Sequence, residues 1–310
     1  MFYESAKHFH KTTLSLCKKM AFSDYYLGSI SCKSYVMENN AKAGPIGIFD
    51  SGFGGLTVFR QIKNKLPQYD YIYLGDNARV PYGTRSFEAV YEFTKECVFK
   101  LFDLGCNLVI LACNTASAKA LRTIQQQDLP PGKRVLGVIR PTAETIQAFT
   151  KTNHIGILAT QGTVLSKSYE LEINKLHPGI AVYQHACPMW VPLVENNEIN
   201  SPATEYIVEK DIQALLALQP AMDCIVLACT HYPLLLEVIQ KYVPAHIQII
   251  AQGPLIADSL QDYLARHPEM EAACSKHGKL QFYTTDSADD FEEKAGVFFQ
   301  EEVLAQHIKV

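Results

Sequence analysis

Long apolar segments are missing from this chain of 310 residues. A helix that crosses a bilayer needs about 20 consecutive apolar residues, whereas the hydrophobic runs here are short, as in 108–113. Clusters of positive charge are missing too, because no basic run is longer than Lys18-Lys19 and the net charge is -4. The chain therefore lacks the features of a membrane protein and of a nucleic-acid binder, and we expect a soluble protein that acts on a small molecule.

Paired cysteine motifs are also absent. The nine cysteines are an odd number and include no Cys-x-x-Cys spacing, which argues against a disulfide framework and against a structural zinc site. We expect reduced thiols, a cytoplasmic location and no bound metal. The cysteines lie at positions 17, 32, 97, 106, 113, 187, 224, 229 and 274.

We do not expect residues 1–43 to act as a secretion signal, because no continuous apolar segment follows the basic residues around Lys18 and Lys19. Met37 precedes the polar stretch Glu38-Asn39-Asn40 and could serve as an alternative start. We interpret residues 1–36 as a disordered tail or as an extension upstream of the true start.

From Gly44 onward, short apolar runs alternate with amphipathic segments and with Gly/Pro turns, which is typical of parallel strands joined by helices. The chain length suffices for two such domains. The fold prediction is therefore α/β. We expect strands at 46–49, 71–74, 108–112 and 282–285, and helices at 56–66, 87–104 and 289–306.

The sequence repeats itself at two landmarks. Ile46-Gly47-Ile48 recurs 109 residues later as Ile155-Gly156-Ile157, and Leu111-Ala112-Cys113 recurs 116 residues later as Leu227-Ala228-Cys229. Similar offsets indicate two related α/β lobes, each with a strand that ends at an Ala-Cys pair. Ligands of open parallel sheets bind beyond the carboxyl ends of the strands, so both cysteines fall where a site is expected.

Cys113 and Cys229 are the candidate reactive groups. A thiol accepts a proton when it is ionised and donates one when it is neutral, and its reference pKa of about 8.5 allows both near neutral pH. The start of a helix favours the thiolate, and we expect a helix after each of these strands. The alternative is that a cysteine ending an apolar strand is a small core residue, which describes Cys97, Cys106 and Cys224 well.

The glycine-rich loop Asp50-Ser51-Gly52-Phe53-Gly54-Gly55 follows the first strand, where backbone N–H groups can hold an anion. The competing hypothesis is a dinucleotide site, for which Asp76 could bind a ribose. However, Thr57 stands where the third glycine of that fingerprint belongs. Asp50 could also simply cap the turn.

Five motifs follow one another along the chain from about Gly44 to the C-terminus. They are Asp50-Ser51-Gly52-x-Gly54-Gly55, Gly75-Asp76 with Pro81-Tyr82-Gly83, Ala112-Cys113-Asn114-Thr115-Ala116, Pro192-Leu193-Val194-Glu195, and Ala228-Cys229-Thr230-His231-Tyr232-Pro233-Leu234. Together and in this order, they resemble the bacterial glutamate racemase family.

The resemblance implies two pseudo-symmetric, doubly wound parallel-sheet lobes with the active site in the cleft between them. The first lobe would comprise residues 44–136 with 256–310, and the second 137–255. It also implies cofactor-independent interconversion of L- and D-glutamate, which supplies D-glutamate for peptidoglycan and hence for the cell wall and cell shape, by a homodimer.

The resemblance assigns the two thiols, Cys113 and Cys229, to proton transfer at Cα, with His231, Asp50 and Glu195 assisting. Glu195 could equally be a solvated turn residue before Asn196-Asn197. The implied substrate-binding residues are Asp50, Ser51, Asp76, Pro81, Tyr82, Gly83, Asn114, Thr115, Thr230 and His231.

Two other functions stay open. One is a related two-cysteine racemase or isomerase that acts on aspartate or another small acid, and the other is a nucleotide-binding oxidoreductase or a non-catalytic binding protein. Arg140 and Gln252 stand where the family varies or carries other residues, and the sequence assigns them no role. We interpret His185, Cys187 and Trp190 as packing residues.

A first prediction concerns the N-terminal extension. Removal of residues 1–36 should leave activity and the thermal unfolding midpoint nearly unchanged, because these residues lack the helical or strand periodicity needed to join a core. Thermal unfolding of the two purified proteins tests this, and a large loss of folded protein on truncation would refute it.

Overall fold

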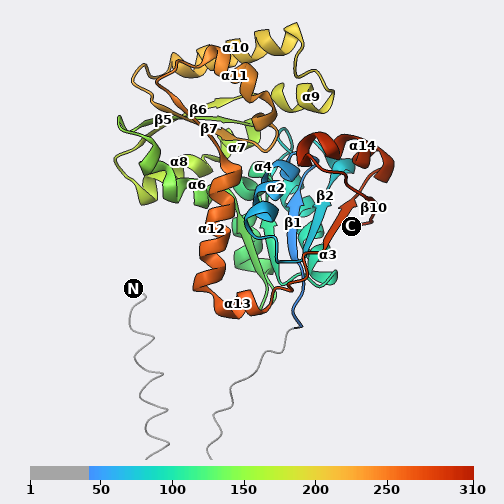
Figure 1. Ribbon diagram of the computed structural model, residues 1–310. Coiled ribbons are helices and arrows are strands. Elements are labelled where there is room, and N and C mark those ends of the chain that lie inside the picture. Colours follow the sequence, from blue (N-terminus) through green and yellow to red (C-terminus); the bar gives the residue numbers. More distant parts are fainter. Residues whose placement is uncertain (1–41) are drawn as a thin grey trace, which may run out of the picture. The chain divides into compact units, whose positions relative to one another are not determined.

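Figure 1 shows the protein as a computed structural model, and the structure describes residues 42–310. The predicted extension at 1–43 lies outside the described residues except for its last two positions, so its interpretation stays a prediction. Within 42–310, no helix combines the length and the apolar character that crossing a membrane requires. The seven cysteines in this part of the chain are free and buried.

Two parallel sheets form the framework. The six-stranded sheet has the order β10-β9-β2-β1-β3-β4, and the four-stranded sheet has the order β6-β5-β7-β8. The strands are β1 (Ile46–Asp50), β2 (Tyr71–Gly75), β3 (Leu108–Leu111), β4 (Arg134–Gly137), β5 (His154–Ala159), β6 (Ala181–Ala186), β7 (Cys224–Ala228), β8 (Gln248–Ala251), β9 (Leu280–Thr284) and β10 (Ala305–His307).

The two copies of the internal repeat form sheets with the same strand order. The order β2-β1-β3-β4 in the first sheet matches β6-β5-β7-β8 in the second. In both, the central strand with the Ile-Gly-Ile sequence pairs with the strand that leads to the Ala-Cys dipeptide: Phe49 lies opposite Leu111, and Ala159 lies opposite Ala228. The α/β fold with two pseudo-symmetric lobes, predicted from the sequence, is confirmed.

Helices cover both sheets. They are α2 (Gly55–Lys65), α3 (Phe87–Asp103), α4 (Asn114–Lys119), α5 (Leu121–Thr123), α6 (Ile139–Thr145), α7 (Gln161–Ser166), α8 (Ser168–Leu176), α9 (Trp190–Glu195), α10 (Pro202–Leu216), α11 (Leu236–Tyr242), α12 (Gln252–Arg266), α13 (Pro268–Ala272) and α14 (Ala288–Phe299). Short 3-10 segments are η1 (Asn77–Arg79), η3 (Ile146–Phe149) and η4 (Tyr232–Leu235), and η2 (Ile124–Asp128) is a π-helical turn.

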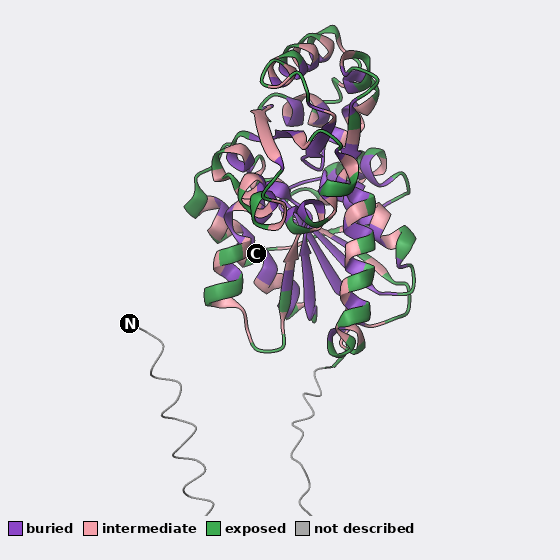
Figure 2. Cartoon of the chain, turned by 90° about the vertical axis from the view of Figure 1, so that its left-hand side faces the viewer, coloured by how far each residue is buried: buried purple, intermediate pink, exposed green. Residues whose placement is uncertain are grey.

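Alternating residues of each strand pack into cores on opposite faces of the sheet, which is why the strands are apolar throughout. In β1, Ile46 and Ile48 pack toward the residues of α2, α12 and α14, whereas Phe49 packs toward those of α3 and α4. The strands of the second sheet divide in the same way, with Ile157 in the core of α6 and α8 and Leu158 on the opposite face. Figure 2 shows these buried strands between helices whose outer faces are exposed.

One sequence prediction about a helix was wrong. The closing helix was expected to run to residue 306, but α14 ends at Phe299, because Gln300 takes a left-handed conformation with φ 61°. The chain then returns as the edge strand β10, and Val303 is buried without being helical. The helix expected after Cys229 is present, but it begins with the 3-10 segment η4, which continues directly into α11.

Candidate functional site

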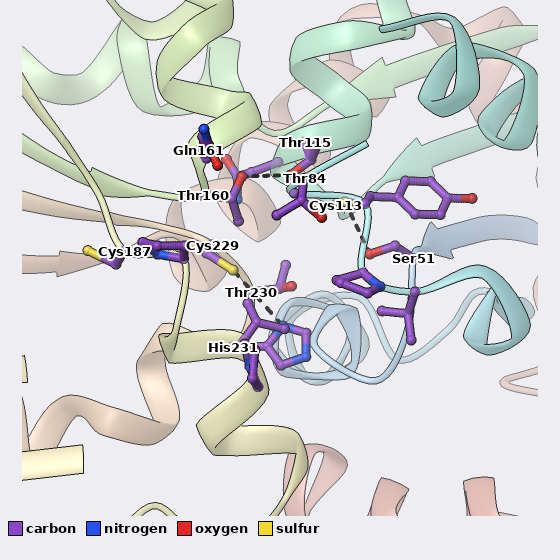
Figure 3. A pocket seen from close by; sticks show the side chains of 18 residues that line it. Ser51, Thr84, Cys113, Thr115, Thr160, Gln161, Cys187, Cys229, Thr230 and His231 are labelled. Carbon is purple, nitrogen blue, oxygen red and sulfur yellow. Dashed lines mark hydrogen bonds between the residues drawn. The ribbon is translucent and has the colours of Figure 1, made fainter. Parts of the chain in front are cut away.

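The carboxyl ends of strands from both sheets meet at one pocket (Figure 3). Ser51 follows β1, Cys113 follows β3, Thr160 follows β5 and Cys229 follows β7. The lining residues are Ser51, Val80, Pro81, Tyr82, Gly83, Thr84, Cys113, Asn114, Thr115, Thr160, Gln161, Cys187, Pro188, Val191, Pro192, Cys229, Thr230 and His231. Two equivalent strand ends thus each contribute a cysteine to one cavity.

Cys113 is the N-cap residue of α4. Its sulfur accepts a hydrogen bond from the backbone N–H of Ala116 at 3.4 Å and donates one to the hydroxyl of Ser51 at 3.5 Å. Burial and then the charge of Asp50 raise the pKa of Cys113 to about 12, and the hydrogen bonds of Ser51 and Ala116 offset this only in part. The helix start does lower the pKa of Cys113 through the backbone N–H of Ala116, as expected, but the loss of solvation outweighs this contribution.

Cys229 has different partners. Its Sγ lies 4.0 Å from Nδ1 of His231, and Nε2 of the same ring lies 2.9 Å from Oε1 of Glu195, the last residue of α9. Figure 3 shows the hydrogen bond between the thiol and the imidazole. In a series of thiol, imidazole and carboxylate, the imidazole can exchange a proton with sulfur while the carboxylate orients the ring.

The environment of His231 favours its charged form. Burial by itself lowers the pKa, but the hydrogen bonds and charges of Cys229 and Glu195 raise it, and the net result is a pKa of about 10. The ring also packs edge-on against Phe298 of α14, with centroids 5.5 Å apart. The imidazole is thus held in one orientation and can carry a proton at neutral pH.

Two predicted carboxylates lie behind the pocket wall and not on it. Asp50 is fully buried and accepts a hydrogen bond from the Thr230 hydroxyl at 3.4 Å. Burial raises the pKa of Asp50, although the neighbouring charge of His231 acts in the opposite direction. Asp76 is fully buried too and accepts a hydrogen bond from the hydroxyl of Tyr82. Each of these acids therefore holds a residue of the lining in place.

The glycine-rich loop packs against the second sheet's cysteine segment. A Cβ at Gly54 would lie 2.3 Å from both Nδ1 of His231 and Oγ1 of Thr230, so only glycine fits there. On that side the space is filled by the protein itself, and a pyrophosphate could not approach the loop as it does in a dinucleotide fold. This close contact argues against the nucleotide-binding alternative.

Hydroxyl groups form another part of the wall. Oγ1 of Thr115 lies 2.9 Å from Oγ1 of Thr160, which in turn lies 3.0 Å from Oγ1 of Thr163. Thr115 and Thr160 follow strands of different sheets, so this pair joins the two halves of the pocket. Such hydroxyls can donate hydrogen bonds to a carboxylate.

One group within 42–310 combines ligand types that bind metals, namely His185, Cys187 and Asp211, with ligand atoms within 4.8 Å of one another. Both oxygens of Asp211 already have partners, Nε2 of His185 at 3.3 Å and the indole N–H of Trp190 at 2.9 Å. The sulfur of Cys187 points away from Cys229 in Figure 3. These contacts explain the group as a brace between β6, α9 and α10.

Comparison with known proteins agrees with this geometry. The family model described as Asp/Glu/hydantoin racemase matches residues 46–260. The chain belongs to the Asp/Glu/hydantoin racemase family. The resemblance predicted from the five motifs is thereby confirmed.

Individual members of the racemase family are similar over most of the chain. A glutamate racemase of Ruegeria sp. (strain TM1040) is 40% identical over 268 residues, which cover 83% of this chain and 97% of that protein. A glutamate racemase isoform of Bacillus anthracis has a solved structure with a TM-score of 0.79 and 33% sequence identity, and the match covers 86% of this chain and 98% of that one. The glutamate racemase of Francisella tularensis, solved in complex with D-glutamate, has a TM-score of 0.75 and 30% sequence identity, and the match covers 86% of this chain and 97% of that one.

The structure brings most of the predicted site residues into the pocket. Those that line it are Ser51, Pro81, Tyr82, Gly83, Cys113, Asn114, Thr115, Cys229, Thr230 and His231. Glu195 reaches the pocket only through His231, and Asp50 and Asp76 do so through Thr230 and Tyr82.

Sequence reasoning missed Thr160 and Cys187, although the repeat contains the signal. When Ile46 is aligned with Ile155, Ser51 corresponds to Thr160. In the sheets, Asp50 pairs with Gly75 as Ala159 pairs with Ala186, so Asp76 corresponds to Cys187. Extending the repeat to all strand ends would have predicted both residues.

The pKa of His231 leads to a prediction about stability. Relative to a reference value of 6.5, the folded chain raises this pKa to about 10, so the folded state keeps a proton that the unfolded state releases. The resulting stabilisation is complete below about pH 6.5 and is lost as the pH rises toward 10. The difference in the free energy of unfolding between the wild type and His231→Asn should therefore shrink over this range in denaturant titrations.

Glu195→Gln provides the matched control for that titration. This variant keeps the imidazole but removes one group that raises its pKa, so the stabilisation by His231 should be smaller and its loss should be complete at a lower pH than in the wild type. A difference between the wild type and His231→Asn that stays constant from about pH 6.5 to 10 would contradict the assignment.

Proposed function

We propose that this racemase interconverts L- and D-glutamate by moving the Cα proton between Cys113 and Cys229. The observation that carries the proposal is the pair of thiols from equivalent strand ends in one pocket, each with its own polar partners. The glutamate racemases that are similar over most of the chain support the choice of glutamate.

The proposed reaction is a balanced exchange of protons. With L-glutamate, the thiolate of Cys229 takes the proton from Cα, and the electron pair of the broken C–H bond moves into the adjacent carboxylate. The thiol of Cys113 then gives its proton to the opposite face of Cα, and that electron pair forms the new C–H bond. Cys229 ends as a thiol and Cys113 as a thiolate, so D-glutamate starts the reverse reaction. No electron is gained or lost, and no cofactor enters the scheme.

The two environments suit these different starting roles. Burial, with the charge of Asp50, raises the pKa of Cys113 and keeps it protonated as the acid. His231 can receive the proton of Cys229 and, through Glu195, carry the resulting positive charge. We assign Asp50, Asp76 and Glu195 to orienting their neighbours, because none of them lines the pocket.

Recognition of glutamate requires donors for two carboxylates. The pocket offers the hydroxyls of Ser51 and Thr115 and the amide of Asn114, and we propose these as carboxylate-binding groups. Thr230, Pro81, Tyr82 and Gly83 shape the wall, since the Thr230 hydroxyl already donates to Asp50. The racemase of Francisella tularensis was solved in complex with D-glutamate, which favours glutamate over aspartate here. The product would serve peptidoglycan synthesis.

Several properties remain proposals of the same kind. We propose that the protein works in the cytoplasm as a homodimer, and that its lobes comprise 44–136 with 256–310 and 137–255. The division of the strands between the two sheets supports these lobes, with β4 ending at Gly137 on the boundary. Size measurement in solution would test the dimer.

An assay with dialysed protein and a chelator tests the function. Loss of optical rotation from L-glutamate and from D-glutamate is the expected result, whereas turnover of L-aspartate alone would indicate the aspartate alternative. Binding of a nicotinamide nucleotide would support the oxidoreductase hypothesis. The same assay without the chelator and with an added divalent metal shows whether a metal changes the rate.

Substitution of either cysteine tests the mechanism itself. Cys113→Ser and Cys229→Ser should each reduce racemisation in both directions by about 10²- to 10⁴-fold, because a serine hydroxyl does not ionise near neutral pH. The double variant should be hardly slower than either single one, since a relay that needs two groups is already broken when one is lost.

A glutamate-like substrate with a leaving group at Cβ separates the two faces. Each single variant could still remove the Cα proton that faces its remaining thiol, and elimination would follow. Cys113→Ser should then prefer the L-enantiomer and Cys229→Ser the D-enantiomer. Equal preference in both variants, or near-normal racemisation by either, would contradict the two-base mechanism.

A further inference from the structure

Three side chains beside the pocket form a closed ring of hydrogen bonds. Nδ2 of Asn114 donates to Oε1 of Gln252 at 2.8 Å, and Nε2 of Gln252 donates to the hydroxyl of Tyr169 at 2.6 Å. The Tyr169 hydroxyl donates in turn to Oδ1 of Asn114 at 2.6 Å. All three residues are at most 4% exposed, so water cannot substitute for a lost partner.

A backbone carbonyl sets the direction of this ring. The hydroxyl of Thr142 donates to the carbonyl of Val138 at 3.2 Å, so its oxygen accepts from Nε2 of Gln252 at 2.7 Å. The same carbonyl lies 3.4 Å from Nε2. A carbonyl oxygen can only accept, and it would repel Oε1 of Gln252 in the reversed orientation. The amide of Gln252 therefore points its oxygen toward Asn114.

This direction has a consequence for the pocket. The amide nitrogen of Asn114 carries two hydrogens, and only one of them has an acceptor among residues 42–310, namely Gln252. The amide oxygen is occupied by Tyr169. Asn114 lines the pocket next to Cys113, so the group it can still offer to a ligand is an N–H donor.

We propose that Gln252 and Tyr169 are positioning residues that fix the Asn114 amide so that this N–H binds a carboxylate of the substrate. The inference rests on the proposed function. Neither residue lines the pocket, and both act through Asn114. Without the ring, the amide can rotate and turn its oxygen toward the carboxylate, which repels it.

The ring also spans the fold, because its members belong to three different helices. Asn114 begins α4 after the first sheet's β3, Tyr169 lies in α8, and Gln252 begins α12 after the second sheet's β8. A ring that served only to tie these helices together would affect stability and leave substrate affinity alone. The two roles therefore make different kinetic predictions.

Tyr169→Phe removes one hydroxyl and leaves the buried aromatic ring in place. We expect KM for glutamate to rise about tenfold in both directions, since a hydrogen bond to a charged group is lost. The matched control is Tyr71→Phe, which removes a buried hydroxyl bonded to the carbonyl of Leu66 at 2.8 Å and should leave KM unchanged. Gln252→Met should behave as Tyr169→Phe does.

A double-mutant cycle distinguishes positioning from a purely structural role. In an Asn114→Ala background, Tyr169→Phe should change KM by less than about twofold, because the residue through which it acts is gone. An unchanged KM in Tyr169→Phe would overturn the inference, as would an equal rise in KM with and without Asn114.

The cycle also separates this inference from the proposed function. A wild-type protein that racemises glutamate, combined with a Tyr169→Phe variant of normal KM, refutes the ring alone. A wild type that does not act on glutamate refutes the proposed function and this use of Asn114 with it.

Discussion

The site depends on the burial of two thiols at the ends of equivalent strands. In water a thiol and a thiolate interconvert near neutral pH, but burial disfavours the charged form of Cys113. The two sulfurs also touch different groups. Cys113 forms hydrogen bonds with Ser51 and with the N–H of Ala116, which lower its pKa, but burial and the nearby charge of Asp50 raise this pKa to about 12. The sulfur of Cys229 instead contacts the imidazole of His231.

Repetition and asymmetry therefore have separate functions in this molecule. The matching strand orders bring two cysteines to one cavity, as a reaction on two faces of one carbon requires. The loops that follow the strands differ, with an α-helix after Cys113 and a 3-10 turn after Cys229. A fully symmetric pair would place both thiols in the same state, and two neutral thiols cannot begin proton transfer. In the proposed mechanism, His231 and Glu195 supply that difference, because His231 can accept the proton of Cys229.

Much of this could be predicted from the sequence because it is local. The repeated Ile-Gly-Ile and Ala-Cys segments predicted the parallel strands, and the end of a parallel strand predicts a site. The contacts that the sequence did not predict join residues that are far apart in the chain. Glu195 meets His231 only because α9 packs beside η4, and Asn114 meets Gln252 across 138 positions of sequence. The left-handed Gln300 that ends α14 gives no signal, since glutamine is not a residue that favours this conformation.

The most direct test of the two-base account is the order in which deuterium enters glutamate in heavy water. If one thiol removes the proton and the other delivers a solvent-derived one, the first molecules of D-glutamate formed from L-glutamate carry deuterium at Cα, while the remaining L-glutamate is still unlabelled. The same should hold from D-glutamate. Mass spectrometry of the separated enantiomers at early times measures this. If a single shuttling base returned the original proton to both faces, the first product would contain hydrogen, and that result would contradict the assignment of Cys113 and Cys229 to opposite faces.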